Sequence, residues 1–201
     1  MILPPRSSAG FTLVEILIVV ALMSILAVAV IPSAAPSIHE DLTSAANIVA
    51  ADLAYGRSVA VLNNDRYQFQ FDLQNNQYTL SYSGSSGTPP PLAPSPFQSS
   101  QDPPNQYVVR LAKLPRLGMP VALFDVQLLA APPVETTTIE FGPLGATTAT
   151  QPAVIWLSAG SGNGQRYISI SLNPATGLAT IGPYQATAPA AANAQATTSG
   201  M

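Results

Sequence analysis

The sequence predicts an α+β protein in which a long N-terminal α-helix, membrane-embedded in its first half, packs on a β-rich C-terminal head. Three observations lead to this fold class. Residues 11–31 form a nearly uninterrupted apolar run, residues 37–62 place apolar side chains at helical spacing, and short runs with strand-like alternation begin at residue 67. A helical stretch followed by a series of strands is typical of an α+β domain.

The composition fits one domain with extensions and excludes several kinds of site. Only 8% of the 201 residues are charged and 47% are hydrophobic, while 20 prolines and 13 glycines indicate many turns. Seven Lys and Arg against ten Asp and Glu give a net charge of -3, so the chain has no electrostatic footprint for nucleic acid. The absence of cysteine excludes disulfides and thiolate metal sites.

The chain begins with a short leader followed by a segment of membrane-spanning length. Residues 1–10 become small and polar after the first few positions and carry one cation, Arg6. Residues 11–31 number 21 and include a single charge, Glu15. As an α-helix this run is roughly 31 Å long, close to the thickness of a bilayer core. Pro32 ends or kinks the helix, and Arg6 favours a cytoplasmic N-terminus.

The apolar run alone leaves two ordinary interpretations open. In the first it is a secretory signal, cleaved at the small residues 27–29, which read Ala-Val-Ala. In the second it is a plain signal anchor. Neither accounts for Glu15, because an unpaired carboxylate in hydrocarbon costs roughly 3 kcal/mol and is functional by default.

The residues around Glu15 carry a more specific signal. Residues 10–15 read GFTLVE, and a long apolar run follows them. This segment resembles the prepilin processing motif of type IV pilins and pseudopilins at all six positions. The resemblance implies cleavage after Gly10 by a membrane prepilin peptidase, and N-methylation of the new terminal residue, Phe11.

The same resemblance gives Glu15 a role in subunit assembly. Cleavage exposes a cationic amine on Phe11, one helical turn from Glu15. In a helical filament the Glu15 carboxylate of one subunit can neutralise the Phe11 amine of a neighbour, and a buried carboxylate is tolerated when it is paired. The implied partners are therefore the prepilin peptidase, sibling pilins or pseudopilins, and the inner membrane.

An amphipathic helix is expected over residues 32–62, continuing into the head. Apolar residues between positions 42 and 53 repeat at the i, i+3 or i+4 spacing of a helix that buries one face. Residues 54–61 (AYGRSVAV) resemble the end of this helix in the GspH/FimT-like minor pseudopilin family. Shorter stretches at residues 138–145 and 168–177 are similar to the same family.

The β-rich head is predicted to occupy residues 63–182. Residues 67–72 and 78–82 alternate apolar and polar side chains on either side of a short polar turn, which predicts a β-hairpin. Further strand-like runs lie at residues 107–114, 121–129, 136–141, 153–157, 167–172 and 178–181.

Two segments of biased composition lie within and after the head. Residues 83–106 are rich in Pro, Ser and Gly and exceed the usual length of a connection, so this loop is either flexible or functional. Residues 183–201 are uncharged and rich in Ala, Thr and Pro, which predicts a disordered tail.

Little in the chain could carry catalysis or hold a cofactor, so we expect neither an enzyme nor a metal site. His39 is the one histidine and has no second His or Cys to complete a common zinc site, which indicates a solvated or capping side chain. Residues 160–164 are glycine-rich but lack the lysine of a phosphate loop, so they predict a hairpin turn. The small basic cluster of Arg110, Lys113 and Arg116 is interpreted as a solvated strand edge.

Together these features predict a structural protein, a minor pseudopilin of a type II secretion pseudopilus that is involved in protein secretion. It is expected to cross the inner membrane once, with its head outside the cytoplasm, and to assemble into a periplasmic or surface filament. One alternative is a minor type IV pilin of a pilus or DNA-uptake machine, although the uncharged residues 183–201 argue against binding of nucleic acid. The other is a secreted or anchored binding protein with an ordinary signal.

Overall fold

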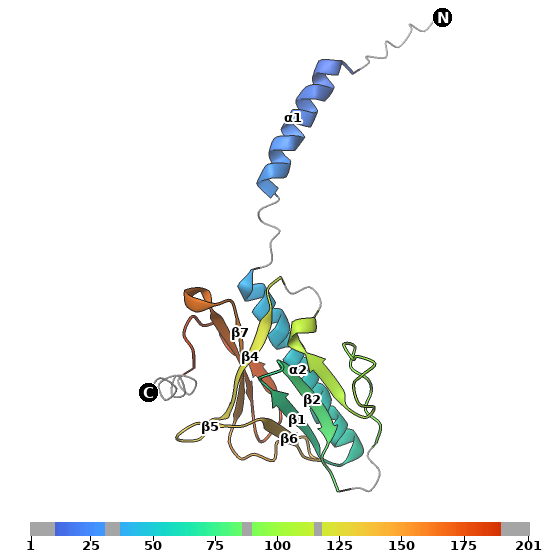
Figure 1. Ribbon diagram of the computed structural model, residues 1–201, viewed down its shortest axis with the longest axis vertical. Helices are drawn as coiled ribbons and strands as arrows, with labels where there is room; N and C mark the ends of the chain where they lie inside the picture. The colour runs from blue at the N-terminus through green and yellow to red at the C-terminus, as the bar shows by residue number, and fades with distance from the viewer. Residues whose placement is uncertain (1–10, 31–36, 86–89, 115–117, 190–201) are drawn as a thin grey trace, which may run out of the picture. The chain divides into compact units, whose positions relative to one another are not determined.

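The structure is a computed structural model that describes residues 11–30, 37–85, 90–114 and 118–189. The predictions for the leader, and for a continuous helix through residues 31–36, lie outside these residues. The chain divides into two compact units, Met1–Ala35 and Pro36–Met201. The first contains helix α1, and the second contains helix α2 and the strands of the head (Figure 1).

Helix α1 spans Leu13–Val30. It begins at Thr12, whose carbonyl oxygen accepts hydrogen bonds from the backbone amides of Glu15 (3.1 Å) and Ile16 (3.3 Å). Its 18 residues give a length of about 27 Å. Among the residues that the structure describes, no helix is both long enough and apolar enough to cross a lipid bilayer.

Helix α2 spans Ile38–Asn63, which confirms the predicted amphipathic helix for its described residues. A capping box fixes its start: the Glu40 amide donates to the Ser37 hydroxyl (3.3 Å), and the Ser37 amide donates to the Glu40 carboxylate (3.1 Å). Asn64 ends the helix in the left-handed conformation, with φ 49°. The buried face carries Leu42, Ala45, Ala46, Val49, Asp52, Leu53, Gly56, Val59 and Ala60.

In the described part of the chain, four antiparallel strands form the first sheet, in the order β3-β2-β1-β6. They are β1 (Tyr67–Asp72), β2 (Gln77–Tyr82), β3 (Tyr107–Arg110) and β6 (Thr138–Phe141). Strands β1 and β2 pair residue by residue along their length, so the predicted hairpin is confirmed. Alternate side chains of β1 are buried, as the period of a half-buried strand requires.

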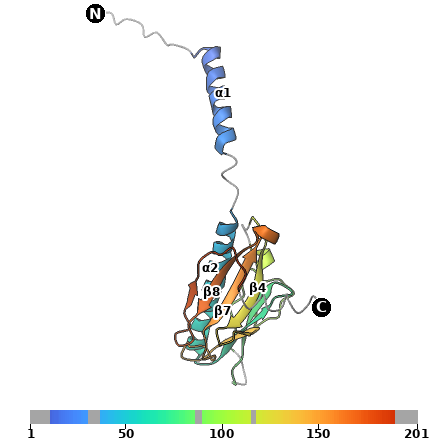
Figure 2. The same cartoon turned by 90° about the vertical axis from the view of Figure 1, so that its left-hand side faces the viewer.

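The second sheet has the order β5-β4-β7-β8-β9 among the described residues, and its neighbouring strands are antiparallel. Figure 2 shows β4, β7 and β8 side by side. Its strands are β4 (Val121–Leu128), β5 (Val134–Glu135), β7 (Ala153–Ala159), β8 (Arg166–Leu172) and β9 (Ala179–Ile181). Every residue of β7 is buried, which places this strand at the centre of the sheet. The pairing of β9 with β8 confirms the predicted return of the last strand.

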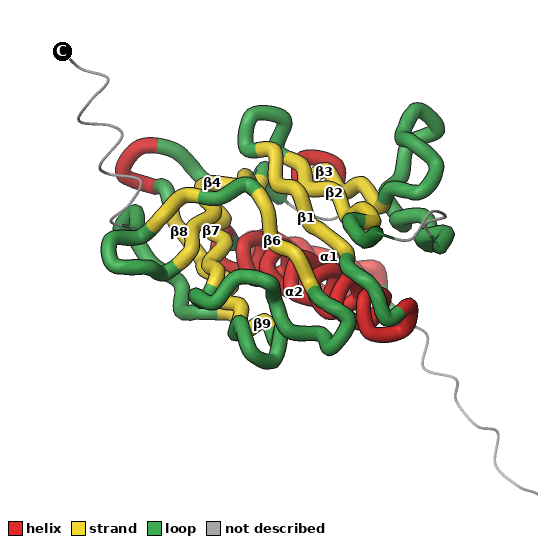
Figure 3. The backbone as a smooth tube through the Cα atoms, turned by 90° about the horizontal axis from the view of Figure 1, so that it is seen from below, coloured by secondary structure: helices red, strands yellow, loops and turns green. Residues whose placement is uncertain are grey.

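Helix α2 packs against both sheets, and it lies along one side of them in Figure 3. One apolar core is formed where the helix and the inner faces of the sheets meet. Its largest fully buried side chains include Tyr67, Phe69, Tyr78, Phe141 and Ile155. A helix packed on a β-rich head confirms the predicted α+β class.

Three details differ from the sequence-based expectations. Residues 111–113 form a 3-10 turn rather than the end of a strand, because the Leu114 amide donates a hydrogen bond of 3.2 Å to the Leu111 carbonyl. Strand β5 was not predicted, since it has only two residues and both are exposed. The chain also remains paired with the head beyond residue 182: the Gln185 and Tyr167 backbones exchange two hydrogen bonds of 2.9 Å. The expected tail from residue 183 is therefore corrected up to residue 189, and residues 190–201 lie outside the described part.

Candidate functional site

The predicted site residues are Gly10, Phe11 and Glu15, and the structure describes the last two. Phe11 lies two positions before the first residue of α1, and its side chain is 78% exposed. Glu15 lies in that first turn and is also exposed. In the full-length chain the Phe11 nitrogen is part of a peptide bond, so an amine at Phe11 would require cleavage after Gly10.

Thr12 is a residue of this site whose role was missed in the sequence. Its hydroxyl oxygen accepts a hydrogen bond of 3.3 Å from the backbone amide of Glu15. Thr12 therefore caps the helix and satisfies one of the amides that an α-helix leaves unpaired at its start. The T-x-x-E spacing of residues 12–15 is the signature that could have revealed this cap. The cap fixes the point where the helix begins, and with it the place of Glu15 in the first turn, where the helix dipole favours a negative charge.

In residues 13–25 of α1, apolar side chains are exposed on every face of the helix. All described side chains of residues 11–25 are exposed, including Leu13, Ile16, Leu17 and Val20. Exposed apolar surface of this extent marks an interaction site, because a helix that is apolar all round is stable only when it is surrounded. The available chemistry is therefore packing against other apolar groups, with Glu15 as the charged exception.

Comparison with protein families identifies this N-terminal segment. Residues 5–31 match the family described as the prokaryotic N-terminal methylation motif. The matched range contains Gly10, Phe11 and Glu15 and all of α1. The protein is therefore type IV pilin-like, as the resemblance of its N-terminus predicted.

Two solved structures are similar to this chain, both of the type IV minor pilin FimU from Pseudomonas aeruginosa (strain PAO1). The crystal in space group P21 has 19% identity and a TM-score of 0.43, and the alignment covers 76% of this chain and 95% of that one. The crystal in space group P65 has 18% identity and a TM-score of 0.42, with coverage of 74% and 98%. A comparison with curated proteins gives no match.

The segments that carry the weaker resemblance to the GspH/FimT-like family meet around Arg57. The Arg57 Nε donates a hydrogen bond of 2.8 Å to the carbonyl of Thr176, in the turn before β9. Gly145 (φ 80°) lies so close that a Cβ there would be 3.0 Å from Arg57 Nε, and a Cβ on Gly177 (φ 64°) would be 2.0 Å from the Gly145 carbonyl oxygen. These glycines let two turns close on the end of α2. Membership of that particular family stays a prediction.

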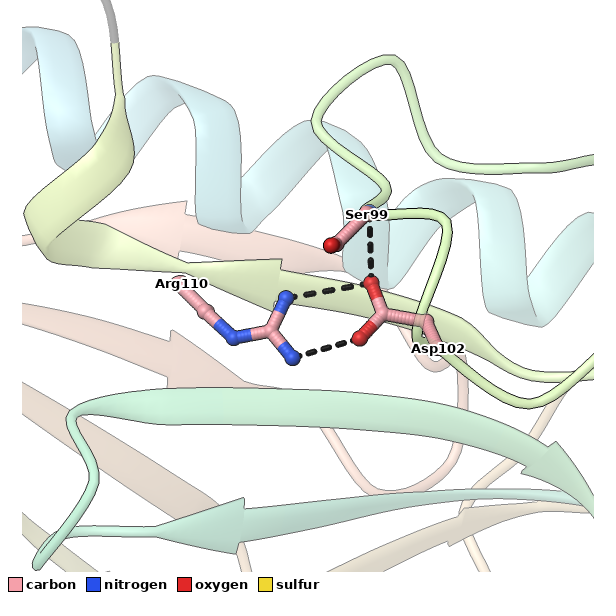
Figure 4. Close-up of polar contacts among 3 residues, drawn as sticks. All are labelled: Ser99, Asp102 and Arg110. Atoms are coloured by element: carbon pink, nitrogen blue, oxygen red, sulfur yellow. Dashed lines mark hydrogen bonds and ion pairs between the residues drawn. The ribbon is translucent and has the colours of Figure 1, made fainter.

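In its described part, the loop at residues 83–106 is held to the head by an ion pair (Figure 4). Arg110 of β3 forms a bidentate ion pair with Asp102, with N–O distances of 3.0 and 2.5 Å. The same carboxylate accepts a hydrogen bond of 2.7 Å from the Ser99 amide. The hydrogen bonds from Arg110 and Ser99 lower the pKa of Asp102 to about 2. The charge of Arg110, predicted to be solvated, is thus used within the head.

His39 packs against another aromatic side chain. Its ring lies 4.9 Å from that of Tyr184, between centroids, and the two rings are tilted by 58°. Among the described residues, no group of three His, Cys, Asp or Glu side chains could hold a metal ion. His39 thus helps to hold the chain after β9 against the start of α2.

Proposed function

We propose that this protein is a minor structural subunit of a type IV pilus-like filament, and specifically of a type II secretion pseudopilus. The observation that carries the proposal is α1: a capped helix with exposed apolar side chains all round and a single carboxylate in its first turn. Packing α1 against the same helix of neighbouring subunits would bury this surface. The assignment to type II secretion rests on the resemblance to the GspH/FimT-like family.

Glu15 is proposed to control assembly through the Phe11 amine of a neighbour. After cleavage at Gly10, the Phe11 nitrogen carries a positive charge, and Glu15 supplies the matching negative charge among apolar helices. An ion pair of this kind compensates two charges that would each be costly to bury alone. Sibling pilins or pseudopilins and the prepilin peptidase are thus the proposed partners.

We place the subunit in the inner membrane before assembly, with the head outside the cytoplasm. This placement is supported by the sequence, in which residues 11–31 carry one charge and Arg6 lies on the leader side. The apolar segment would then meet lipid first and neighbouring helices afterwards, so one surface serves both environments.

The alternative of a DNA-uptake pilin would need basic residues available on the head. Arg110 is paired with Asp102, and the Arg166 guanidinium donates to the carbonyls of Asn163 and Gln165. Arg57 likewise donates to the Thr176 carbonyl. These contacts favour a structural role for these three arginines over contact with phosphates.

Replacement of Glu15 by leucine tests the proposal with three readouts. Membrane insertion should persist, because removal of a charge from an apolar run makes insertion easier. Leader cleavage should persist as well, because the peptidase acts at Gly10. Recovery in sheared filaments should fall on the order of tenfold or more, because the neighbour's amine is left without a counter-charge.

The matched control is Glu40→Leu, which removes a glutamate from the same position in the first turn of α2. It should lower the stability of the head while filament incorporation continues. Uncleaved Glu15→Leu precursor would assign Glu15 to peptidase recognition instead. Entry of the Glu15→Leu protein into filaments at the wild-type level would refute the assembly role.

A further inference from the structure

The turn that joins β7 to β8 is built from the glycine-rich residues 160–164. The antiparallel pairing of β7 with β8 confirms that this segment is a hairpin turn. Its last three residues form the 3-10 turn η3 (Gly162–Gly164), which is drawn in orange after β7 in Figure 1. Two of its glycines, Gly160 (φ 84°) and Gly162 (φ 56°), adopt the left-handed conformation. Residues 161–164 are exposed, so the turn is open to water.

Asn163 and Gly164 form a dipeptide in which the backbone can react with a side chain. Of the nine asparagines in the chain, Asn163 is the one that a glycine follows. In such a pair the backbone nitrogen of the second residue can attack the Cγ carbon of the asparagine and close a succinimide ring. A side chain on the second residue hinders this approach, and glycine has none. A Cβ built on Gly164 would meet nothing within 4 Å, so no neighbouring atom crowds this glycine either.

The side chain of Asn163 is free to turn towards the backbone. It is exposed and makes no hydrogen bond within the part of the chain that the structure describes. Asn76, by contrast, uses both its amide nitrogen and its oxygen in hydrogen bonds to β4. The Asn173 oxygen accepts hydrogen bonds from two backbone amides of its own turn. Side chains that are held in this way cannot rotate onto the following peptide group, whereas that of Asn163 can.

Arg166 contacts the peptide group that would react. Its Nη1 atom donates hydrogen bonds to the carbonyl oxygens of Asn163 (2.9 Å) and Gln165 (2.8 Å). The Asn163 carbonyl belongs to the same amide as the Gly164 nitrogen, which must lose its proton to act as a nucleophile. A cation bonded to an amide oxygen stabilises the negative charge that develops when the amide nitrogen loses its proton. The geometry therefore places a positive charge where it would favour the attack.

One hydrogen bond of the turn opposes the reaction. The Gly164 amide donates to the Ser161 carbonyl (3.1 Å), so the turn must open before the nitrogen reaches Cγ. An exposed 3-10 turn of three residues is held weakly, because its hydrogen bonds have poor geometry and compete with water. Opening of the turn leaves the sheet intact, since the ladder between β7 and β8 ends at the pair of Ala159 and Arg166.

We propose that Asn163 is a site of spontaneous deamidation through the Gly164 nitrogen, promoted by Arg166. The Gly164 nitrogen loses its proton and forms a bond to Asn163 Cγ. The bond between Cγ and the side-chain nitrogen breaks, and that nitrogen takes up a proton and leaves as ammonia. Water then adds to one of the two carbonyl carbons of the succinimide and breaks its bond to the Gly164 nitrogen, which regains a proton. The products are aspartate and isoaspartate, without any oxidation or reduction.

The reaction changes the charge of the β7–β8 turn without disturbing the strands. Either product adds one negative charge beside Arg166, with which the new carboxylate can pair, and isoaspartate also lengthens the backbone by one methylene group. Both changes fall beyond the last pair of the β7–β8 ladder, so the converted head should stay folded. The inference concerns the head alone and does not depend on the proposed function, because no readout below requires cleavage, membrane insertion or a filament.

Peptide mapping by mass spectrometry tests the site. The full chain is incubated in uncharged detergent at physiological temperature and mildly alkaline pH. Residue 163 should convert to a mixture of aspartate and isoaspartate, with one ammonia released for each residue converted. Asn173 is the internal control and should remain asparagine, because the following Pro174 has no amide proton to lose. Gly164→Ala should slow the conversion on the order of tenfold, because its Cβ hinders the attack.

Arg166→Met tests the role of the guanidinium in the same assay. If the cation activates the Gly164 nitrogen, its removal should slow the conversion several-fold, and Arg166→Lys, which keeps the charge, should convert nearly as fast as wild type. If Arg166 only holds the turn closed, its removal should speed the conversion, and this result would overturn its role. No conversion in the wild type, equal rates in wild type and Gly164→Ala, or conversion only in the urea-unfolded chain would each overturn the site itself.

Discussion

The carboxylate of Asp52, in the middle of α2, accepts a hydrogen bond of 2.5 Å from the hydroxyl of Tyr78 in β2. Its second oxygen accepts a hydrogen bond of 2.8 Å from Tyr107 in β3. Asp52 is 8% exposed, so this network joins the helix to the edge of the first sheet inside the core. Burial raises the pKa of Asp52, while burial and the adjacent carboxylate raise that of Tyr78.

Replacement of Asp52 by alanine should destabilise the head by about 3 kcal/mol, because two buried hydroxyls lose their acceptor. Asp52→Asn keeps one acceptor and should cost less. Urea unfolding of the full chain in uncharged detergent measures both. In a double-mutant cycle with Tyr107→Phe, the Asp52→Ala cost should shrink, and strictly additive effects would show that the two groups do not interact.

The raised pKa of Asp52 predicts the direction in which the stability of the head changes with pH. Its folded pKa is raised above 3.8, so the folded state holds a proton that the unfolded state has released as the pH rises above 3.8. The stability contributed by this proton is present below 3.8 and is lost as the pH rises through the folded value. Comparison of wild type with Asp52→Asn should isolate a falling component in that window, and an identical pH profile for both proteins would contradict it.

Gly56 marks the closest approach of α2 to the first sheet. A Cβ at this position would lie 2.4 Å from Cε2 and 2.9 Å from Cζ of Phe69, which is fully buried in β1. Gly56→Ala should therefore destabilise the head by about 1–2 kcal/mol, because the overpacking exceeds the gain of about 1 kcal/mol in helix propensity. Thermal or urea unfolding gives the measurement.

Gly164→Ala is the control for the same chemical change, since a Cβ there meets nothing within 4 Å. Its effect should stay within about 0.5 kcal/mol. Combining Gly56→Ala with Phe69→Leu should cost less than the sum of the single changes, because the shorter side chain makes room. A neutral or stabilising Gly56→Ala would show that the ring shifts freely.

The Asp102–Arg110 ion pair should weaken in acid. Its contribution to stability therefore changes with pH in the opposite direction from that of Asp52. The pKa of Asp102 falls from 3.8 to about 2 in the folded state, so its contribution is present above 3.8 and is lost as the pH falls towards 2. Hydrogen exchange at the Ser99 amide should accelerate in this window, because that amide donates to Asp102. In Asp102→Asn the exchange should already be fast at neutral pH, whereas amides of β7 should be unchanged. Slow exchange of the Ser99 amide in the variant would show that Asp102 does not hold this loop.

Local patterns account for the parts of the fold that the sequence predicted well. The body of α2 could be predicted because apolar residues between positions 42 and 53 repeat at helical spacing, whereas the capping box of Ser37 and Glu40 that fixes its start was not recognised. The β1–β2 hairpin was recognisable because its residues alternate around a polar turn. Each of these signals lies within a few residues of the chain, where spacing determines which side chains can meet.

Such local patterns could not predict contacts between segments that are distant in the sequence. Asn76 was recognisable only as part of a turn, yet its side chain donates to the Val121 carbonyl (2.9 Å) and accepts from the Leu123 amide (2.7 Å), which ties the hairpin to β4 of the other sheet. Nothing near Asp52 in the sequence reveals that it meets two tyrosines. In the N-terminal site, Glu15 and Phe11 were predictable from the processing motif. The helix cap from Thr12 could have been predicted only from the T-x-x-E spacing of residues 12–15, which lies within the same motif.

The last prediction concerns processing of the N-terminus. The mature chain should begin at Phe11 and carry a methyl group on its amine, as the match of residues 5–31 to the N-terminal methylation motif suggests. Intact-mass analysis of protein extracted from membranes measures both changes. Gly10→Val should accumulate as full-length precursor, because a branched side chain at the cleavage position obstructs close approach of the peptidase to the backbone. Glu15→Leu provides the internal comparison, since its precursor should still be cleaved. A mature N-terminus at Val30 or beyond would instead establish ordinary signal cleavage, and it would remove α1, Glu15 and the filament proposal together.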